Sequence, residues 1–296
     1  MAMTEPDQLV IPVDLARAAK NEGRQGWLAS LPVTIGRLET AAWSICVGQP
    51  FQPGGRTAWV APATRDGEDL VVKVLWRHPE AEHEADALRA WDGDGAVRLH
   101  ADAQVDSKTI ALLLERCQPG TTLKGRPEAE QDIVVAGLLR RLWRQPPAAH
   151  RFCSLQSMCQ LWADEFEHET ADGRGCLDPG LAREGIALFR ELPANADQEM
   201  LLCTDLHAGN VLAAEREPWL VIDPKPYVGD PTYDALQHLL NCDVRLHTDP
   251  HRLLARMAEL LDLHPDRLRL WLFARCVQES PDWPSLAEVA RRLAPA

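Results

Sequence analysis

The sequence lacks several features that would place it in other classes of protein. It has no apolar run of about 20 residues, the length that a transmembrane helix needs. Its first residues are acidic, without the basic start and apolar core of a signal peptide. The eight cysteines are scattered and form no C-x-x-C pair, so neither a disulfide framework nor a zinc site is expected. These absences favour a cytoplasmic protein with no membrane partner.

Positive charge is also scarce. Lysine and arginine number 31 against 44 aspartates and glutamates, which gives a net charge of −13. This balance disfavours nucleic acid as a partner, because nucleic-acid binding depends on neutralising phosphates. It suits a small cationic substrate, although acidity usually means only solubility. The length of 296 residues and the apolar share of 46% predict one large or two small domains with a packed core. We expect a monomer.

One stretch in the second half of the chain combines polar side chains with short apolar runs. Asp205 is followed by Asn210 and then by Asp223, and the apolar flanks predict strands that bring the last two side by side. Their oxygens can hold Mg²⁺, which prefers hard oxygen ligands. Asp205 would then orient a hydroxyl nucleophile, as in a phosphoryl-transfer site of the kinase type. The alternative is that all three are ordinary loop residues.

Residues 204–210, 222–225 and 229–234 together resemble the aminoglycoside phosphotransferase family. The Asp-Pro-Lys and Gly-Asp-Pro pieces are most similar to its streptomycin 6-kinase and hydroxyurea kinase branch. This chain has Cys203 and Thr204 where the family usually has His-Gly, and that His supports the loop rather than reacting.

The resemblance implies a phosphotransferase with the two-lobed protein-kinase-like fold, of the α+β class. Residues 1–117 would form a nucleotide-binding lobe with a mostly antiparallel sheet and a helix. Residues 118–296 would form a mainly helical lobe with the catalytic loop and the acceptor site. ATP (or GTP) would lie between the lobes. Asp205 would be catalytic, and Asn210 and Asp223 would bind Mg²⁺.

Two features of the first half fit nucleotide binding. A hairpin is predicted over 43–62, and backbone N–H groups of its Gly54–Gly55 turn would point at phosphates, unless this is an ordinary hairpin turn. Lys73 lies in an apolar β-branched run, where burying an unpaired lysine is costly. It resembles the phosphate-binding lysine of kinases, although it could instead lie on the exposed face of an edge strand.

A helix predicted over 79–91 supplies the partner of Lys73. Helical spacing puts Glu84 on the same face as Leu88 and Trp91, so Glu84 should point towards Lys73, with Glu80 as its competitor. Strands are predicted over 97–101 and 109–115. The resemblance then implies a hinge at 115–117 whose backbone, at Glu115 and Cys117, binds the adenine edge; the alternative is a plain linker.

After residue 120 the apolar spacing becomes helical. Helices are predicted over residues 128–143, 154–170, 178–192, 231–241, 250–263, 265–279 and 283–293. The acidic run 164–172 would line the site of a cationic acceptor, through Glu165, Glu167 and Glu169, unless it is a solvated helix face. Asp230, a further substrate candidate, and Asp234 should cap the following helix and brace the catalytic loop. Weaker substrate candidates are Glu279 and Asp282, and His207 should position the catalytic loop.

The most specific hypothesis is transfer of the γ-phosphate of ATP to a hydroxyl of a streptomycin-type aminoglycoside. Hydroxyurea and an endogenous metabolite such as an amino sugar remain as alternative acceptors. A nucleotide-binding pseudokinase that acts as a scaffold is the alternative outside enzymes, although Asp205, Asn210 and Asp223 argue against it.

Overall fold

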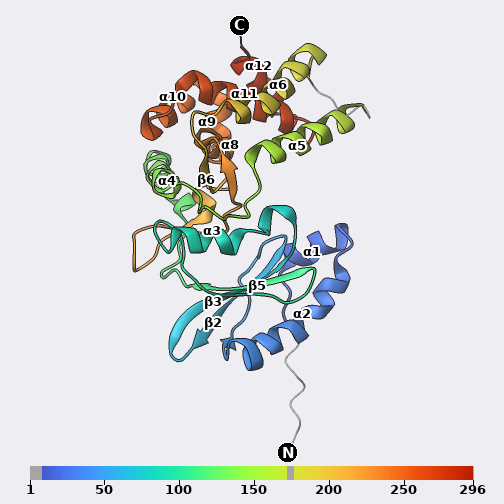
Figure 1. Ribbon diagram of the computed structural model, residues 1–296, viewed down its shortest axis with the longest axis vertical. Helices are drawn as coiled ribbons and strands as arrows, with labels where there is room; N and C mark the ends of the chain where they lie inside the picture. The colour runs from blue at the N-terminus through green and yellow to red at the C-terminus, as the bar shows by residue number, and fades with distance from the viewer. Residues whose placement is uncertain (1–8, 172–176, 296) are drawn as a thin grey trace, which may run out of the picture. The chain divides into compact units, whose positions relative to one another are not determined.

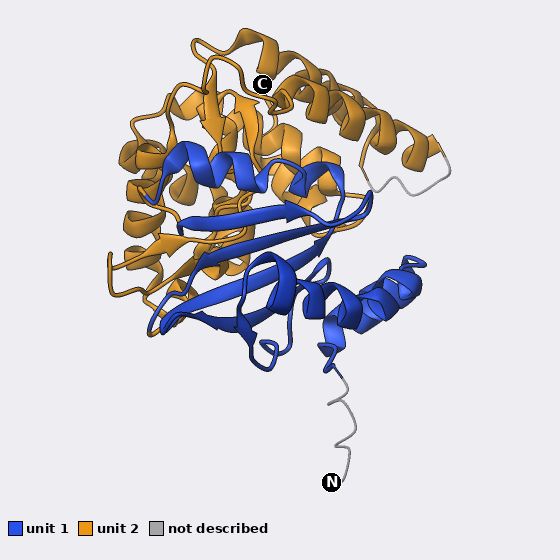
Figure 2. Ribbon diagram, turned by 60° about the horizontal axis from the view of Figure 1, so that its bottom comes forward, with its two compact units in different colours: residues 1–93, 97–118 blue, residues 94–96, 119–296 orange. Residues whose placement is uncertain are grey.

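The computed structural model describes residues 9–171 and 177–295 (Figure 1). The chain divides into two compact units: unit 1 comprises residues 1–93 and 97–118, and unit 2 comprises residues 94–96 and 119–296 (Figure 2). A sheet dominates unit 1 and helices dominate unit 2, which confirms the predicted α+β fold. The assignment of residues 1–117 to nucleotide binding stays a prediction.

Unit 1 is built on one antiparallel sheet. The bounds of strands β1 to β5 are Cys46–Val47, Ala58–Arg65, Glu68–Trp76, Leu99–Gln104 and Thr109–Glu115, and their order in the sheet is β1-β2-β3-β5-β4. The predicted strand over 43–47 shrinks to two residues, because the chain is still helical at Ala42 and turns at Ser44, where φ is 52°. Asp66 and Gly67 connect β2 to β3 with positive φ at both residues, as in a type I′ hairpin turn.

Helices cover both faces of this sheet (Figure 1). Their bounds are Val13–Asn21 (α1), Gln25–Arg37 (α2), Leu38–Ala42 (η1), Pro79–Ala81 (η2) and Glu84–Trp91 (α3). Along β3, Leu70, Val72 and Val74 share a core with Trp27 of α2, so the alternation of the strand turns Lys73 to the opposite face. β3 is an interior strand and Lys73 is only 7% exposed. The alternative of a solvent-facing lysine on an edge strand is therefore wrong.

Unit 2 combines helices with two short hairpins. The hairpins pair β6 (Met200–Leu202) with β9 (Tyr227–Gly229) and β7 (Val211–Leu212) with β8 (Leu220–Val221). The helices are Glu128–Leu142 (α4), Leu155–Glu169 (α5), Pro179–Glu191 (α6), Pro231–Asp234 (α7), Leu236–Asn241 (α8), Asp243–Thr248 (α9), Pro250–Leu261 (α10), Pro265–Glu279 (α11) and Leu286–Leu293 (α12). Short turns of 3₁₀-helix are Leu123–Gly125 (η3), Leu192–Asn195 (η5) and Ala208–Asn210 (η6).

Most helices predicted for unit 2 are present, with two differences. The helix predicted over 231–241 is interrupted at Ala235, which separates α7 from α8. Helix α9 was not predicted, because Leu246 is its one buried residue and leaves no apolar periodicity to detect. Among the described helices, none has both the length and the apolar character to cross a bilayer.

Helices α6 and α11 approach each other closely at Gly185. A Cβ atom at this position would lie 2.5 Å from Cγ2 of Val277, well inside van der Waals contact. Elsewhere along α11, Trp271 is fully buried and makes edge contacts with Phe189 of α6 and with Tyr233. The missing side chain of Gly185 therefore lets two helices of the unit 2 core pack against each other.

Replacing Gly185 by alanine should destabilise the protein by about 1–3 kcal/mol, because the added methyl group overpacks the α6–α11 contact. Gly137→Ala is the matched control: Gly137 lies inside α4 with open space where Cβ would stand, so alanine should stabilise by about 0.5–1 kcal/mol. Urea unfolding of both variants measures the difference. Equal effects of the two substitutions would contradict the packing argument.

Candidate active site

The predicted catalytic loop, residues 203–210, starts at the end of a buried strand. Leu201 and Leu202 of β6 are fully buried against β9, and the polar residues follow directly after them. The β7–β8 hairpin then brings the chain back, and the amide of Ile222 donates to the carbonyl of Asn210 at 2.9 Å. Asp223 directly follows Ile222, so this hydrogen bond places Asp223 close to Asn210, as the predicted hairpin requires.

The side chains of Asp205 and Asn210 contact each other. The Nδ2 atom of Asn210 lies 3.0 Å from the carbonyl oxygen of Asp205 and 3.3 Å from its Oδ2 atom, and it donates to both. Because the amide nitrogen faces Asp205, the amide oxygen is the atom of Asn210 left to ligate a cation. The Asp223 side chain is 45% exposed and its backbone is left-handed, with φ at 53°. An amide oxygen and an accessible carboxylate fit the preferences of Mg²⁺.

Lys225 also belongs to this site, although the sequence prediction gave it no role. Its Nζ atom lies 3.3 Å from Oδ2 of Asp205 and 3.9 Å from Oδ1 of Asp223. The position of Lys225, two residues after Asp223, is the one sequence signal that could have pointed to it.

A buried carboxylate braces the catalytic loop. Asp234 accepts hydrogen bonds from the amides of Cys203 (3.0 Å) and Thr204 (2.5 Å) and from Nε1 of Trp143 (2.9 Å). Burial raises the pKa of Asp234 to about 6, although these hydrogen bonds act in the opposite direction. The predicted bracing role of Asp234 is confirmed. His207 also supports the loop, because its Nδ1 atom accepts the Gly209 amide at 3.1 Å at the start of η6.

Cys203 and Thr204, the two departures from the family pattern, have different structural effects. Cys203 is fully buried, and burial raises the pKa of its thiol well above the usual value, so it is unsuited to act as a nucleophile. Thr204 has φ at 48°, a left-handed conformation that costs a residue with a side chain about 1–3 kcal/mol. Its hydroxyl donates to the carbonyl of Lys225.

Unit 1 contains the predicted ion pair. Nζ of Lys73 lies 2.7 Å from both carboxylate oxygens of Glu84, which is 2% exposed. The competitor Glu80 is half-exposed and lies near His78 instead. Removing one partner of such a pair leaves a buried charge uncompensated, so each side chain requires the other. The phosphate-binding role of the pair stays a prediction.

The other nucleotide candidates occupy ordinary structural positions. Gly54 has φ at 83°, and a Cβ atom there would lie 2.4 Å from Pro12, so packing against the start of α1 explains the glycine. A Cβ atom at Gly55 would lie 3.9 Å from the carbonyl oxygen of Ala58, an ordinary van der Waals contact. Glu115 ends β5, where its amide donates to Arg98, and Cys117 follows as a half-buried residue. Their proposed contacts with phosphates and adenine stay predictions.

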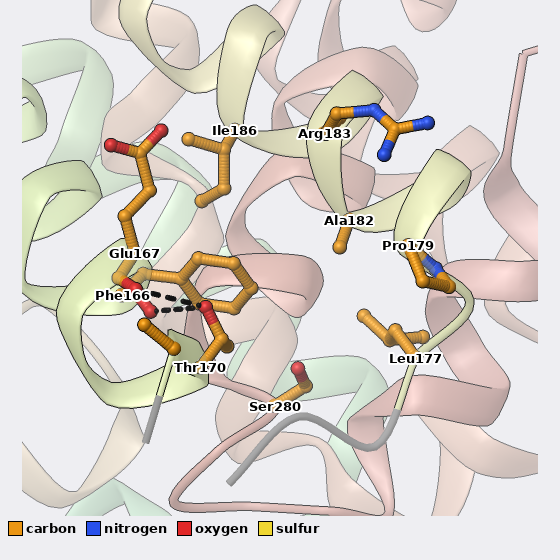
Figure 3. A pocket seen from close by; sticks show the side chains of 10 residues that line it. Phe166, Glu167, Thr170, Leu177, Pro179, Ala182, Arg183, Ile186 and Ser280 are labelled. Carbon is orange, nitrogen blue, oxygen red and sulfur yellow. Dashed lines mark hydrogen bonds between the residues drawn. The ribbon is translucent and has the colours of Figure 1, made fainter. Parts of the chain in front are cut away.

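The acidic helix α5 is partly neutralised. Arg190 of α6 donates to Glu167 at 2.6 and 2.9 Å and to Asp164 at 2.6 Å, which lowers the pKa of Glu167. Glu165 is exposed and Glu169 is half-buried, while Asp172 lies outside the described residues. Figure 3 shows the neighbouring cavity of 520 Å³, where the carboxylate of Glu167 lies at the end away from Leu177 and Ser280.

The substrate role suggested for Asp230 is not supported. Asp230 is 3% exposed, accepts the Thr232 amide at the start of α7, and accepts hydrogen bonds from Arg267 and Trp271 at 2.8 and 2.6 Å. It is therefore a buried helix cap, as its position before Pro231 also indicated.

A second cavity of unit 2, of 480 Å³, contains one of the weaker acidic candidates. Its lining comes from η3, α8, α9 and α11 and from the residues before α12, and includes Lys124, Gln237, Asn241, Asp243, Glu279 and Trp283. The Glu279 carboxylate contacts Arg275 at 2.6 Å, and Trp283 is 63% exposed. Amides, carboxylates and an exposed indole together suit a polar ligand with a ring that can stack.

One group of buried side chains is close enough to hold a metal, among the residues that the structure describes: Asp132, His238 and Cys242. Asp132 already accepts hydrogen bonds from Arg245, Arg256 and His238 at 2.6–2.9 Å. Burial would lower the pKa of His238, but its hydrogen bonds to Asp132 and Cys242 outweigh burial and raise that pKa to about 9. Because Asp132 is already paired with two arginines and with His238, its contacts account for the group as an ion cluster that joins α4, α8, α9 and α10.

The Asp132 cluster should make stability depend on pH. The folded state holds the His238 proton more tightly than the unfolded chain, whose histidines titrate near about 6.5. The stabilisation is therefore complete below pH ~6.5 and is lost as pH rises towards about 9. Urea midpoints measured over this range for wild type and His238→Asn should converge as pH rises. Parallel curves would show that His238 is neutral in the fold.

Comparison with known proteins agrees with this geometry. A family model described as aminoglycoside/hydroxyurea antibiotic resistance kinase matches residues 46–285. A hydroxyurea phosphotransferase of Kitasatospora aureofaciens is 37% identical over 246 residues, 80% of this chain and 68% of that protein. A streptomycin 6-kinase of Streptomyces glaucescens is 33% identical over 273 residues, 90% of this chain and 86% of that protein. The crystal structure of aminoglycoside phosphotransferase APH(4)-Ia has a TM-score of 0.57 at 15% identity, covering 89% of this chain and 97% of that one.

The fold is of the protein-kinase-like type, and the family model and the similar kinases make the chain a phosphotransferase. Because the family model spans well over half of the sequence, the chain belongs to the aminoglycoside/hydroxyurea antibiotic resistance kinase family. The family and branch predicted from the sequence motifs are confirmed.

Proposed function

We propose that this protein transfers the γ-phosphoryl group of ATP to a hydroxyl of an aminoglycoside of the streptomycin type. The observation that carries the proposal is the contact between Asp205 and Asn210 on the catalytic loop, next to the strand end that presents Asp223. The streptomycin 6-kinase relative, which aligns with 90% of this chain, supports the acceptor class. A cytoplasmic monomer that uses ATP, or GTP, with Mg²⁺ completes the proposal.

In the proposed reaction, Asp205 orients the acceptor hydroxyl and accepts its proton late in the transfer. The hydroxyl oxygen forms a bond to the γ-phosphorus while the bond from phosphorus to the bridging oxygen breaks, and ADP leaves. Asn210 and Asp223 would hold Mg²⁺, which neutralises charge on the phosphate oxygens when bound. Lys73, fixed by Glu84, would neutralise the α- and β-phosphates, with backbone groups at Gly54, Gly55, Glu115 and Cys117 as further nucleotide contacts. Catalysis is then mostly positioning.

Two groups of carboxylates are candidates for binding a cationic acceptor. The first comprises Glu165, Glu167 and Glu169 of α5, although Arg190 already neutralises Glu167. The second comprises Asp243 and Glu279 in the 480 Å³ cavity, where Trp283 can stack on a ring. Both groups border a cavity and each has one carboxylate paired with an arginine, Glu167 with Arg190 and Glu279 with Arg275. The second group also offers side-chain amides and an exposed indole, so it is the stronger candidate.

Hydroxyurea is the second candidate acceptor, because the hydroxyurea phosphotransferase relative is 37% identical. The two acceptors differ in charge. Guanidinium groups pair well with carboxylates, whereas hydroxyurea is neutral and small. The salt dependence of the acceptor KM therefore distinguishes them.

The test offers ATP with streptomycin, hydroxyurea or a neutral polyol at two salt concentrations and measures phosphorylated product. We expect streptomycin to be phosphorylated with a KM that rises with salt, because screening weakens its attraction to the acidic protein. Asp243→Asn with Glu279→Gln should raise the streptomycin KM more than it lowers kcat, and more than the three α5 substitutions to glutamine do. Turnover of a neutral acceptor without product from streptomycin would reject the aminoglycoside assignment.

Replacing Asp205 by asparagine should lower kcat at least about 10²-fold and leave nucleotide affinity nearly unchanged, because it removes a general base without removing a phosphate contact. Asp197→Asn, a change of an exposed aspartate away from the loop, serves as the control. Near-wild-type kcat in the Asp205 variant would exclude Asp205 as the base.

A further inference from the structure

Lys225 is the charged residue of the catalytic region to which the proposed reaction assigns no part. Its ammonium lies 3.3 Å from Asp205, the proposed base, and 3.9 Å from Asp223, the proposed metal ligand. The side chains of Lys225 and Asp205 are each 21% exposed, so the group is partly withdrawn from water but open to a ligand. A lysine between these two carboxylates is therefore close to where phosphate charge must be stabilised.

The backbone of Lys225 is attached to the catalytic loop on both sides. Its amide donates to the carbonyl of Cys203 at 2.9 Å, and the same carbonyl accepts the amide of Asp205 at 2.8 Å. Its carbonyl accepts the hydroxyl of Thr204. Two hydrogen bonds thus join the backbone of Lys225 to Cys203 and Thr204, and a third ties Asp205 to the same Cys203 carbonyl, so the backbones that carry the ammonium and the carboxylate are fixed relative to each other.

We propose that Lys225 is a catalytic residue whose ammonium donates to a non-bridging oxygen of the γ-phosphoryl group during transfer, and that Thr204 is its positioning residue. The proposal rests on the proposed phosphoryl transfer. In that step the acceptor oxygen bonds to phosphorus, the bond to the ADP oxygen breaks, and the acceptor proton passes to Asp205. Lys225 stays protonated throughout and keeps its contact with Asp205.

The alternative is that Lys225 only balances the charge of two neighbouring acids. A lysine with only this role would act on stability, because its removal would leave two neighbouring carboxylates partly buried without compensation. A fixed ammonium beside a reacting phosphate would act on kcat, since it needs no reorganisation when charge moves onto the oxygens. Lysine is also a common phosphate ligand that acts as a point charge. The two possible roles of Lys225 therefore predict different effects of its removal on kcat.

Thr204 gives independent support. A β-branched residue is unfavourable at a φ of 48°, where glycine would be free of strain. The one hydrogen bond that glycine could not make there is the bond from the hydroxyl to the Lys225 carbonyl. The amide of Thr204, which donates to Asp234, would be retained by any residue except proline. The hydroxyl therefore accounts for a threonine at this strained position.

The first test replaces Lys225 by methionine, with Lys20→Met, at an exposed lysine of α1, as the control. We expect kcat to fall about 10²–10³-fold, the effect of losing one donor to developing charge, and nucleotide Kd to change less than about threefold. Slow hydrolysis of ATP by water is measured in parallel, so that Lys225 is tested even if none of the acceptors offered is phosphorylated. Unchanged kcat, or a loss of nucleotide affinity equal to the loss of kcat, would overturn the proposal.

The second test uses three substitutions of Thr204 and does not require the lysine variant to fold. Thr204→Gly removes the strain and the hydroxyl, Thr204→Val removes only the hydroxyl, and Thr204→Ser keeps it. We expect glycine and valine to lower kcat about three- to tenfold, as for one lost hydrogen bond, and serine to retain it. The Thr204→Gly variant should lower kcat and yet raise the melting temperature, because it also removes the backbone strain. If kcat follows stability across the three variants, Thr204 has only a structural role.

Discussion

A buried carboxylate, Asp234, organises the catalytic loop by accepting three N–H groups at once. Two of them are consecutive amides, of Cys203 and Thr204, which fixes the orientation of the chain just before Asp205. The third is the indole N–H of Trp143, which follows α4. A buried carboxylate without such partners would be costly, so the loop and the carboxylate stabilise each other. The contact therefore fixes the backbone immediately before Asp205.

Residues whose roles follow from local spacing were predicted well from the sequence. Helical periodicity placed Glu84 opposite Lys73, and the 2.7 Å ion pair is present. Apolar pairs around Asn210 and Asp223 predicted the hairpin that brings them together. The predicted pairing of strands over 43–62 is present as β1 against β2, although Cys46 and Val47 pair with Thr64 and Ala63, just beyond the predicted hairpin. The Asp66–Gly67 turn carries a typical hairpin signal that the sequence interpretation did not use.

Features that depend on distant partners could not be predicted. The Asp132 cluster draws its members from four helices, and no local pattern relates Asp132 to Arg245 or Arg256. The acids of α5 looked available to a substrate because their partner, Arg190, lies more than 20 residues further along the chain. Lys225 was visible in its motif, but its contact with Asp205 required two separate loops to meet.

The comparisons distinguish the fold, which distant relatives share, from the choice of acceptor, which differs between relatives. Its fold extends to a phosphotransferase of 15% identity, so the fold alone does not define an acceptor. Its two more similar relatives bear the names of chemically different acceptors, hydroxyurea and streptomycin. The residues that choose between acceptors should therefore lie outside the catalytic loop, on surfaces such as the cavity beside α8 and α11.

The contact between α6 and α11 has an evolutionary consequence. With a virtual Cβ of Gly185 at 2.5 Å from Val277, position 185 cannot gain a side chain while position 277 stays unchanged. A descendant with alanine at 185 needs a smaller residue at 277, and a bulkier residue at 277 is compatible only with glycine at 185. Substitutions at positions 185 and 277 should thus occur together among members of the family. Proteins that carry alanine at 185 with valine at 277 should be rare, because that combination is destabilised.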